Sequence, residues 1–303
     1  MKKNPYTLMK VAFLGPAVLA YVGIFLYPTL RTTVMSFFTV GSITDAMGKW
    51  TFAGLGNYAD LFASTLFMRS VSNLGGIWLF GGLIVFAFAM LFAVILTSGV
   101  RFKSFWRAVI YLPNVISAVA MGTMWMQYVY SSRYGLLKGL FSSLGLERLA
   151  AIPWTSPDYI FGALLVAYCF GMVGYFMLIF MAGIEKIPAD FYEAATIDGA
   201  SRAAQFWKIT VPLLKGVLRT SLVLWTISTV GFFVWSMIFS PLNPEPGTVT
   251  PMVYMYQMVF GANMVVTDRN VGAGAAVGVI LSLMVLAIFL VSSRIAREDD
   301  LEY

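Results

Sequence analysis

Histidine is absent from the sequence of 303 residues, and cysteine occurs once, at Cys169. A metal site or a nucleophile built from histidine and cysteine is therefore excluded. The single cysteine cannot form a disulfide within the chain, so it says nothing about the redox compartment. No GxxxxGK[ST] phosphate-binding loop is present, and a Ser/His/Asp set cannot be assembled. No catalytic residue and no metal are expected, and ATP hydrolysis by such a loop would need another subunit.

Charge is the second thing that the sequence has little of. Only 11% of the residues are charged, whereas a soluble domain carries roughly 25%. Hydrophobic residues make up 59%, aromatic residues 16%, and the mean hydropathy is +0.81. This composition indicates a protein embedded in a lipid bilayer. The net charge of +6 is spread between apolar runs and forms no patch, so nucleic acid is not an expected partner.

Six apolar runs are long enough to cross a bilayer, which takes about 20 residues each. They predict an all-α membrane protein with six transmembrane helices in a single domain over residues 1–303. The first run follows a basic start, as in a signal peptide, but it exceeds the roughly 7–15 apolar residues of a signal core and is expected to be retained. The predicted spans are residues 9–30, 76–98, 107–130, 159–183, 217–240 and 271–293.

The basic residues set the predicted orientation, because Lys and Arg concentrate in cytoplasmic loops. With both termini in the cytoplasm, thirteen of the 20 basic residues lie inside and seven lie outside. The outside segments, residues 31–75, 131–158 and 241–270, have room for small interfacial helices. Residues 240–251 are rich in Pro and Gly and predict an irregular loop. The acidic end, residues 297–303, is expected to be solvated.

The predicted spans lack ionisable groups at membrane depth. All fourteen acidic residues fall in loops, in tails or at span ends. A proton relay is therefore disfavoured, although sodium could still use backbone and hydroxyl oxygens. Active transport by this chain would need energy from another subunit.

The segment over residues 184–216 separates the fourth and fifth spans and predicts a helix–turn–helix elbow. Pro188 and Asp190 suit the start of a first helix, and Gly199 suits a left-handed stop. A second helix follows, and Pro212 can start or bend the approach to the fifth span. Small side chains beside the turn leave a surface that another protein can approach closely.

The stretch EAATIDGASRAAQFWKITVP, residues 193–212, resembles the EAA motif of permease subunits in ABC importers. The motif is EAA, three residues, Gly, nine residues, Ile, one residue, an aliphatic residue and Pro. Val211 stands where Leu is usual. YPTLRTTVMSF, RAVIYLPNVISAVAMGTMW and GAGAAVGVILSLM resemble the carbohydrate branch, the maltose and sn-glycerol-3-phosphate type. The Gly-Gly-Pro stretch frequent in that family is replaced here by NPEPGTVTP. The matching motif residues are Glu193, Ala194, Ala195, Gly199, Ile209 and Pro212.

The resemblance implies a type I ABC importer permease fold in a prokaryotic inner or plasma membrane. The elbow would then be the coupling helix, with Glu193 and Asp198 offering anionic contacts to a cytoplasmic ATPase. The implied partners are a second homologous permease, two ATP-binding-cassette ATPase subunits and an extracytoplasmic solute-binding protein. No cofactor is expected in this chain, because ATP and Mg would be bound by the ATPase.

Candidate solute contacts lie in the spans that flank the elbow, because aromatic faces and hydroxyl groups suit a sugar. Tyr168, Met172 and Tyr175 recur at helical spacing in the fourth span. In the fifth span Trp225, Thr229 and Phe232 do so, and Asn114 and Ser117 are weaker candidates in the third. The alternative interpretation is that these aromatic residues pack against other helices.

The favoured function is a subunit of an ATP-driven, binding-protein-dependent sugar importer. Three alternatives stay open. One is a permease for sn-glycerol-3-phosphate or another small polar solute, although no basic residue lies at mid-membrane to meet a phosphate. Another is a self-sufficient secondary carrier or channel, and the third is a structural or receptor membrane protein.

Overall fold

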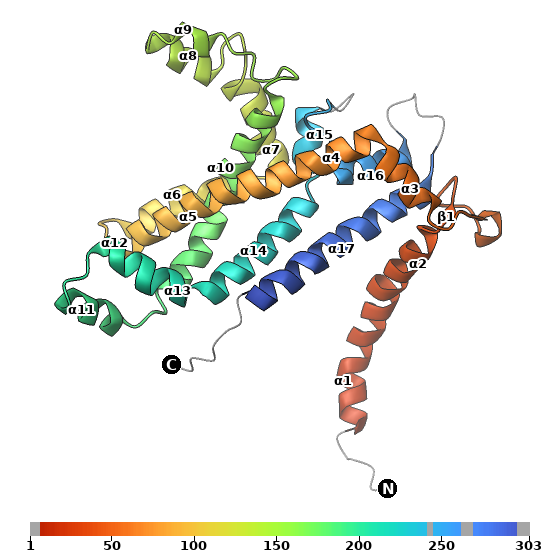
Figure 1. Cartoon of the computed structure of the whole chain (residues 1–303), viewed down its shortest axis with the longest axis horizontal. Coiled ribbons are helices and arrows are strands. Elements are labelled where there is room, and N and C mark those ends of the chain that lie inside the picture. Colours follow the sequence, from red (N-terminus) through yellow and green to blue (C-terminus); the bar gives the residue numbers. More distant parts are fainter. Residues whose placement is uncertain (1–6, 241–244, 262–268, 296–303) are drawn as a thin grey trace. The chain divides into compact units, whose positions relative to one another are not determined.

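The structure is a computed structural model, and it describes residues 7–240, 245–261 and 269–295. The chain divides into two compact units. The first unit comprises Met1–Thr65 and Tyr254–Ser282, and the second comprises Leu66–Val253 and Leu283–Tyr303. The elements are named as in Figure 1. The undescribed residues include all of the acidic end, residues 297–303, and part of the predicted loop over residues 240–251.

The first unit starts with one long helical run and ends with the beginning of the last span. The run consists of α1 (Thr7–Ala20), the π-helical η1 (Tyr21–Leu26) and α2 (Tyr27–Met35). The short helices η2 (Met47–Lys49) and α3 (Gly56–Ala63) follow. The unit also contains most of α16 (Pro251–Phe260) and the first half of α17 (Val271–Ile295).

A small hydrogen-bonded ribbon departs from the all-α prediction. Strands β1 (Phe38–Thr39) and β2 (Thr51–Phe52) pair antiparallel, with Phe38 opposite Phe52. The Asn57 side chain donates to the carbonyl oxygens of Ser36 and Phe38, each at 2.9 Å. The backbone N–H of Val271 donates to the carbonyl of Val40 at 2.8 Å. These bonds fix the end of α2 against the beginning of α17 within this unit.

The second unit is built around α10 (Ile160–Ile184), which packs against α5 (Gly82–Thr97), α6 (Lys103–Val115) and α14 (Lys215–Val230). In Figure 1, α5 and α6 run side by side, and α10 and α14 lie next to them. Helix α5 continues a run that starts with α4 (Thr65–Gly76) and η3 (Ile77–Gly81). The remaining elements are α7 (Ala118–Met124), η4 (Trp125–Val129), α8 (Leu136–Ser143), α9 (Glu147–Ala150), α11 (Ala189–Ile197), α12 (Arg202–Gln205), η5 (Phe206–Thr210), α13 (Val211–Leu213) and α15 (Val234–Phe239).

Among the described residues, four helices are long and apolar enough to cross a membrane by themselves: Met9–Met35, Thr65–Thr97, Ile160–Ile184 and Val271–Arg294. The second begins at Thr65 instead of residue 76, and two polar residues of its first turns, Ser70 and Asn73, are buried in the protein. Asn73, for example, donates to the carbonyls of Pro246 and Val249 at 2.6 and 2.9 Å. Two further helix pairs pass the same test only when each bent pair is taken as one span.

The third predicted span is not continuous as expected. Helices Lys103–Val115 and Ala118–Val129 meet at 95°. Pro113 has no backbone N–H, and Ile116 is extended, so the helix stops there. The Ser117 side chain then accepts the N–H of Ala120 at 3.3 Å and caps the next helix.

The prediction of one continuous fifth span over residues 217–240 is also wrong. Helix α14 ends at Val230, and α15 starts at Val234. Gly231 closes the first helix, and the carbonyl of Phe232 accepts the Thr250 hydroxyl at 2.6 Å instead of a helical N–H. Helix α14 begins at Lys215, two residues before the predicted start of the fifth span, and it follows a bend of 68° in the chain.

Candidate functional site

The elbow between α10 and α14 forms as two short helices with a glycine turn. Helix α11 starts after Pro188, carries Asp190 in its first turn, and ends at Ile197. Gly199 has φ of +77°, which confirms the predicted left-handed stop. The N–H of Gly199 bonds to the carbonyl of Thr196 at 3.0 Å, and the N–H of Ala200 bonds to Ala195 at 2.8 Å. This is the paired bonding of a Schellman motif, which satisfies the last carbonyls of α11.

A second helix returns from the turn and is tied to the first by side chains. The Ser201 side chain caps it by accepting the N–H of Ala204 at 3.2 Å. Gln205 donates to the Thr196 hydroxyl at 2.9 Å, and the Tyr192 and Thr210 hydroxyls lie 3.0 Å apart. These contacts hold the two helices of the elbow together.

Pro212 lies inside this second helix rather than at its end. The helix runs from Arg202 to Leu213 and includes the π-helical segment Phe206–Thr210. The change of direction falls at Leu214, which is buried. The bend that the sequence placed at Pro212 is therefore found two residues later.

The motif residues differ in exposure. Glu193, Ala194, Asp198 and Gly199 are exposed, whereas Ala195, Ile209 and Pro212 are half-buried. Ile197 is 87% exposed, more than any other large hydrophobic side chain in the described part of the protein. Ile197 was not among the predicted contacts, although an aliphatic residue directly before the turn of an exposed elbow is itself a signal.

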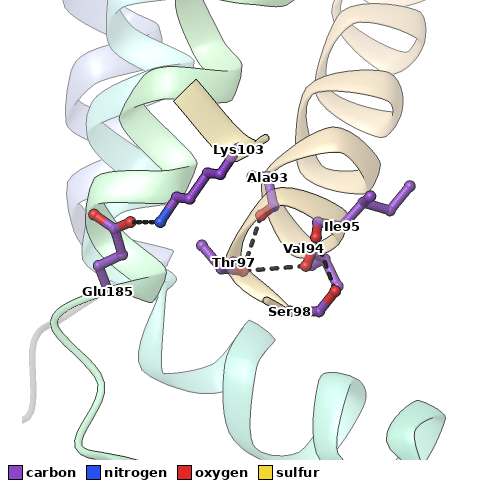
Figure 2. A network of polar contacts seen from close by, with 7 residues as sticks. All are labelled: Ala93, Val94, Ile95, Thr97, Ser98, Lys103 and Glu185. Carbon is purple, nitrogen blue, oxygen red and sulfur yellow. Dashed lines mark hydrogen bonds and ion pairs between the residues drawn. The ribbon is translucent and has the colours of Figure 1, made fainter. Parts of the chain in front are cut away.

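One ion pair lies at the base of the elbow, as Figure 2 shows. The Lys103 ammonium at the start of α6 approaches a carboxylate oxygen of Glu185 at the end of α10 to 2.5 Å. Their side chains are 38% and 46% exposed, so water screens the attraction. Nearby, the Thr97 and Ser98 hydroxyls donate to carbonyls of their own helix end. The pair lies where the end of α10 meets the start of α6.

Four of the candidate solute contacts are buried in the second unit. Tyr168, Trp225, Thr229 and Phe232 are each at most 4% exposed. The Trp225 indole donates to the carbonyl of Trp78 at 2.8 Å, and its ring packs on Tyr168 with the centroids 5.5 Å apart. The Thr229 hydroxyl donates to the carbonyl of Trp225 at 2.8 Å. In this arrangement these side chains join α5, α10 and α14, and they can reach a solute only if the helices separate.

The other candidates keep part of their surface accessible. Tyr175 and Met172 are half-buried on α10, and Ser117 is exposed. Asn114 donates to the carbonyl of Gly171 at 3.2 Å and lies 3.9 Å from the Met172 sulfur. Asn114 therefore serves a neighbouring helix and not the backbone of its own.

An apolar cavity of about 560 Å³ lies between α5, α6 and α10. Its lining offers one thiol and no hydroxyl or charged side chain, so it lacks the groups that orient a sugar. In the described part of the chain no three His, Cys, Asp or Glu residues lie close enough to hold a metal ion. The residues that line the cavity are Ile84, Phe88, Phe92, Val109, Ile110, Pro113, Val166, Cys169, Phe170 and Val173.

Comparison with known proteins gives the family. The sequence profile of the binding-protein-dependent transport system inner membrane component matches residues 61–297. The chain belongs to this family of inner membrane components. A relative named probable ABC transporter permease protein, from Pyrococcus horikoshii, is 32% identical over 96% of each chain. The diacetylchitobiose uptake system permease protein of Streptomyces coelicolor is 27% identical over 93% of this chain and 81% of its own.

A solved structure matches the fold of this protein over nearly its whole length. It is a chain of a bacterial ABC transporter involved in the import of the acidic polysaccharide alginate, and it matches 97% of the present chain with a TM-score of 0.79. That chain is 20% identical and 96% covered, so it shows the fold alone. The protein therefore has the fold of an ABC importer permease, and residues 193–212 lie inside the matched region. The resemblance drawn from the EAA stretch is confirmed.

Proposed function

We propose that this inner membrane component is a permease subunit of an ATP-driven, binding-protein-dependent sugar importer. It forms half of a translocation pathway with six spans, of which the third and the fifth are interrupted. The observation that carries the proposal is the EAA elbow, an exposed helix–turn–helix between two spans in a chain of this family. The chain itself is not catalytic, and a separate ATPase binds ATP and Mg.

In this proposal the elbow is the coupling helix, and residues 184–216 form the coupling segment. Ile197 presents an aliphatic side chain to a groove of the ATPase, while Glu193 and Asp198 meet basic groups around it. The Schellman turn at Gly199 supports this role because it closes α11 without a bulky side chain. Ala194 and Ala195 support it by leaving room for close approach.

Sugar as cargo is supported by the names of relatives. An arabinooligosaccharides transport system permease protein from Halalkalibacterium halodurans is 29% identical over 94% of this chain, and the relative from Streptomyces coelicolor is named for diacetylchitobiose. The candidate contacts that keep accessible surface in this arrangement are Tyr175, Asn114, Met172 and Ser117. Tyr168, Trp225, Thr229 and Phe232 join them only if α10 and α14 move apart. A phosphate-bearing cargo remains the alternative.

The partners follow from the same proposal. They are a second, homologous permease, two ATPase subunits on the cytoplasmic side and a solute-binding protein on the outer side. The whole chain forms one transmembrane domain in a prokaryotic cell membrane, with both termini in the cytoplasm.

Cysteine labelling tests this orientation. Cys169 is the only cysteine in the sequence, so Cys169→Ser provides a background without other thiols in this chain. In intact spheroplasts, a membrane-impermeant maleimide should label Ser143→Cys on α8 and should label Ser201→Cys only after permeabilisation. Both positions are exposed, so a difference reports the side of the membrane. Labelling in the opposite order would reverse the topology.

Capture of the assembled complex tests the coupling role. The wild-type chain in mild detergent should bring down an ATPase and a second permease. Glu193→Lys and Ile197→Ser should lose the ATPase and keep the permease. Glu147→Lys and Leu136→Ser, equivalent changes at exposed positions of α9 and α8, should keep both. A chain that comes down alone, and whose transport survives ATP depletion, would instead be a secondary carrier.

A further inference from the structure

An arginine faces an apolar cavity at one end of the first span. Arg31 lies in α2, four residues before the span Met9–Met35 ends. The cavity has a volume of about 310 Å³ and is lined by α2, α16, α17 and Ile43, all within the first unit. The span end at Met35 and the start of the last span at Val271 meet here. The cavity therefore lies at the boundary between the hydrocarbon and the headgroup region.

The Arg31 guanidinium has no acceptor among the described residues. Its Nε is buried without a hydrogen-bond partner, and its recorded contact is the ring of Trp50, 5.8 Å from the guanidinium carbon. The nearby Asp45 carboxylate accepts the N–H of Ser42 at 2.8 Å, and no ion pair joins it to Arg31. A buried donor without an acceptor is costly, so a ligand that supplies one is expected.

The rest of the lining determines which ligand fits. A guanidinium matches the oxygens of a phosphate, to which it can donate two parallel hydrogen bonds. Tyr27 and Thr32 add hydroxyl groups, but most of the lining is apolar, including Met35, Val259 and Val271. A sugar or a free phosphate would leave that apolar surface uncovered. A molecule with one phosphate and a hydrocarbon chain covers both parts.

We propose that this cavity binds a membrane phospholipid, with its phosphate on Arg31 and the start of an acyl chain along α16 and α17. Trp50, whose ring lies against the Arg31 guanidinium, suits headgroup depth, where such aromatic side chains concentrate. The lipid site is separate from the coupling segment and from the solute contacts proposed above. It does not depend on which solute is transported.

Lipid-dependent thermal stability tests the proposal on the full chain, purified with its partners in a neutral detergent. Titration with dioctanoyl phosphatidylglycerol should raise the melting temperature of the wild type. Arg31→Gln should raise the lipid concentration needed for half of this shift roughly tenfold or more, because it removes hydrogen bonds to a charged group. Arg31→Lys keeps the charge without the planar fork and should fall between the two. Arg133→Gln, which removes an exposed charge elsewhere, should respond as the wild type does.

Two further ligands separate the sources of the phosphate. Glycerol phosphate and inorganic phosphate, which lack acyl chains, should give no shift at the concentrations where the lipid acts. Dioctanoylglycerol, which lacks the phosphate, should also give none. An equal response of Arg31→Gln and wild type would overturn the assignment to Arg31. Glycerol phosphate acting as well as the lipid would mean a site for free phosphate and would overturn the lipid. If Arg31→Gln does not fold, Arg31→Lys against Arg133→Gln decides.

Discussion

The indole N–H of Trp225 donates to the backbone carbonyl of Trp78 at 2.8 Å, and the Trp78 indole donates to the Thr226 hydroxyl at 2.9 Å. The two indole N–H groups thus donate in opposite directions across the boundary between α14 and the π-helical segment Ile77–Gly81. Trp225 packs so closely there that a Cβ built on Gly82 would lie 2.8 Å from its indole nitrogen.

Replacing Trp225 with Phe should lower stability because it removes the indole donor and part of the ring. We expect a loss of about 0.5–2 kcal/mol in the free energy of unfolding, the range for one such bond within a membrane. Unfolding in mixed detergent micelles measures it. Trp207→Phe is the control, because Trp207 is 67% exposed on the elbow. Equal stability of Trp225→Phe and wild type would contradict the packing role.

Helix α6 approaches α10 through the backbone at Gly174. A Cβ at this position would lie 2.3 Å from the carbonyl oxygen of Ile110, and backbone atoms cannot give way as a flexible side chain can. Gly174→Ala should therefore destabilise the protein by about 1–3 kcal/mol or more. Thermal unfolding in detergent measures the change.

Gly162 on the same helix is the matched control. It is exposed, and a Cβ built there meets nothing within 4 Å. Gly162→Ala should be neutral or stabilise by about 0.5–1 kcal/mol, because alanine is the better helix former. Similar losses in both variants would mean that crowding at Ile110 is not the cause.

The turn of the elbow should depend on its glycine. Gly199→Ala forces a side chain into the left-handed region, at a cost of about 1–2 kcal/mol. The turn should shift, and transport and ATPase capture should both fall severalfold. Uptake in whole cells and co-purification measure these effects.

Gly145 provides the control for backbone strain alone. Its φ is +71°, and like Gly199 it has nothing within 4 Å of a built Cβ. Gly145→Ala should carry a similar strain but leave transport and ATPase capture unchanged, because it lies between α8 and α9. Equal functional losses in both variants would show that strain anywhere in the chain lowers activity.

The Lys103–Glu185 pair should contribute little to stability. Both side chains are partly exposed, so a double-mutant cycle with Lys103→Met and Glu185→Gln should give a coupling energy of at most about 1 kcal/mol. The coupling should shrink further in high salt. A value above about 2 kcal/mol, unchanged by salt, would mean that the pair is shielded from water in the assembled protein.

Composition predicted the helical membrane class, and the residues of the elbow predicted the left-handed Gly199, because these features depend on local chemistry. The family was predicted from the resemblance of residues 193–212 to the EAA motif. The helix breaks at Ile116 and Gly231 escaped prediction, because hydropathy measures how apolar a run is and does not report where its helix is interrupted. The early start at Thr65 was missed because Asn73 looks solvent-exposed until its partners, more than 170 residues later, are known.

The roles of the aromatic residues also depend on contacts that are distant in sequence. Trp225 fits both a solute contact and a packing residue in sequence, and its burial against Trp78 depends on two helices far apart in the chain. The cavity beside Arg31 likewise joins residues from both ends of the sequence. Tyr175 and Asn114 stay predictions as solute contacts, and so does the docking of Glu193.

The cross-tied elbow has a mechanical consequence. Tyr192 is bonded to Thr210, and Gln205 is bonded to Thr196, so the two helices of the elbow are held together by side chains. We therefore expect a displacement of Ile197 at the tip to move both helices together. The elbow meets the start of α14 at the 68° bend at Leu214. In the proposed coupling role, we expect a push at the tip to rotate this span instead of being absorbed within the loop.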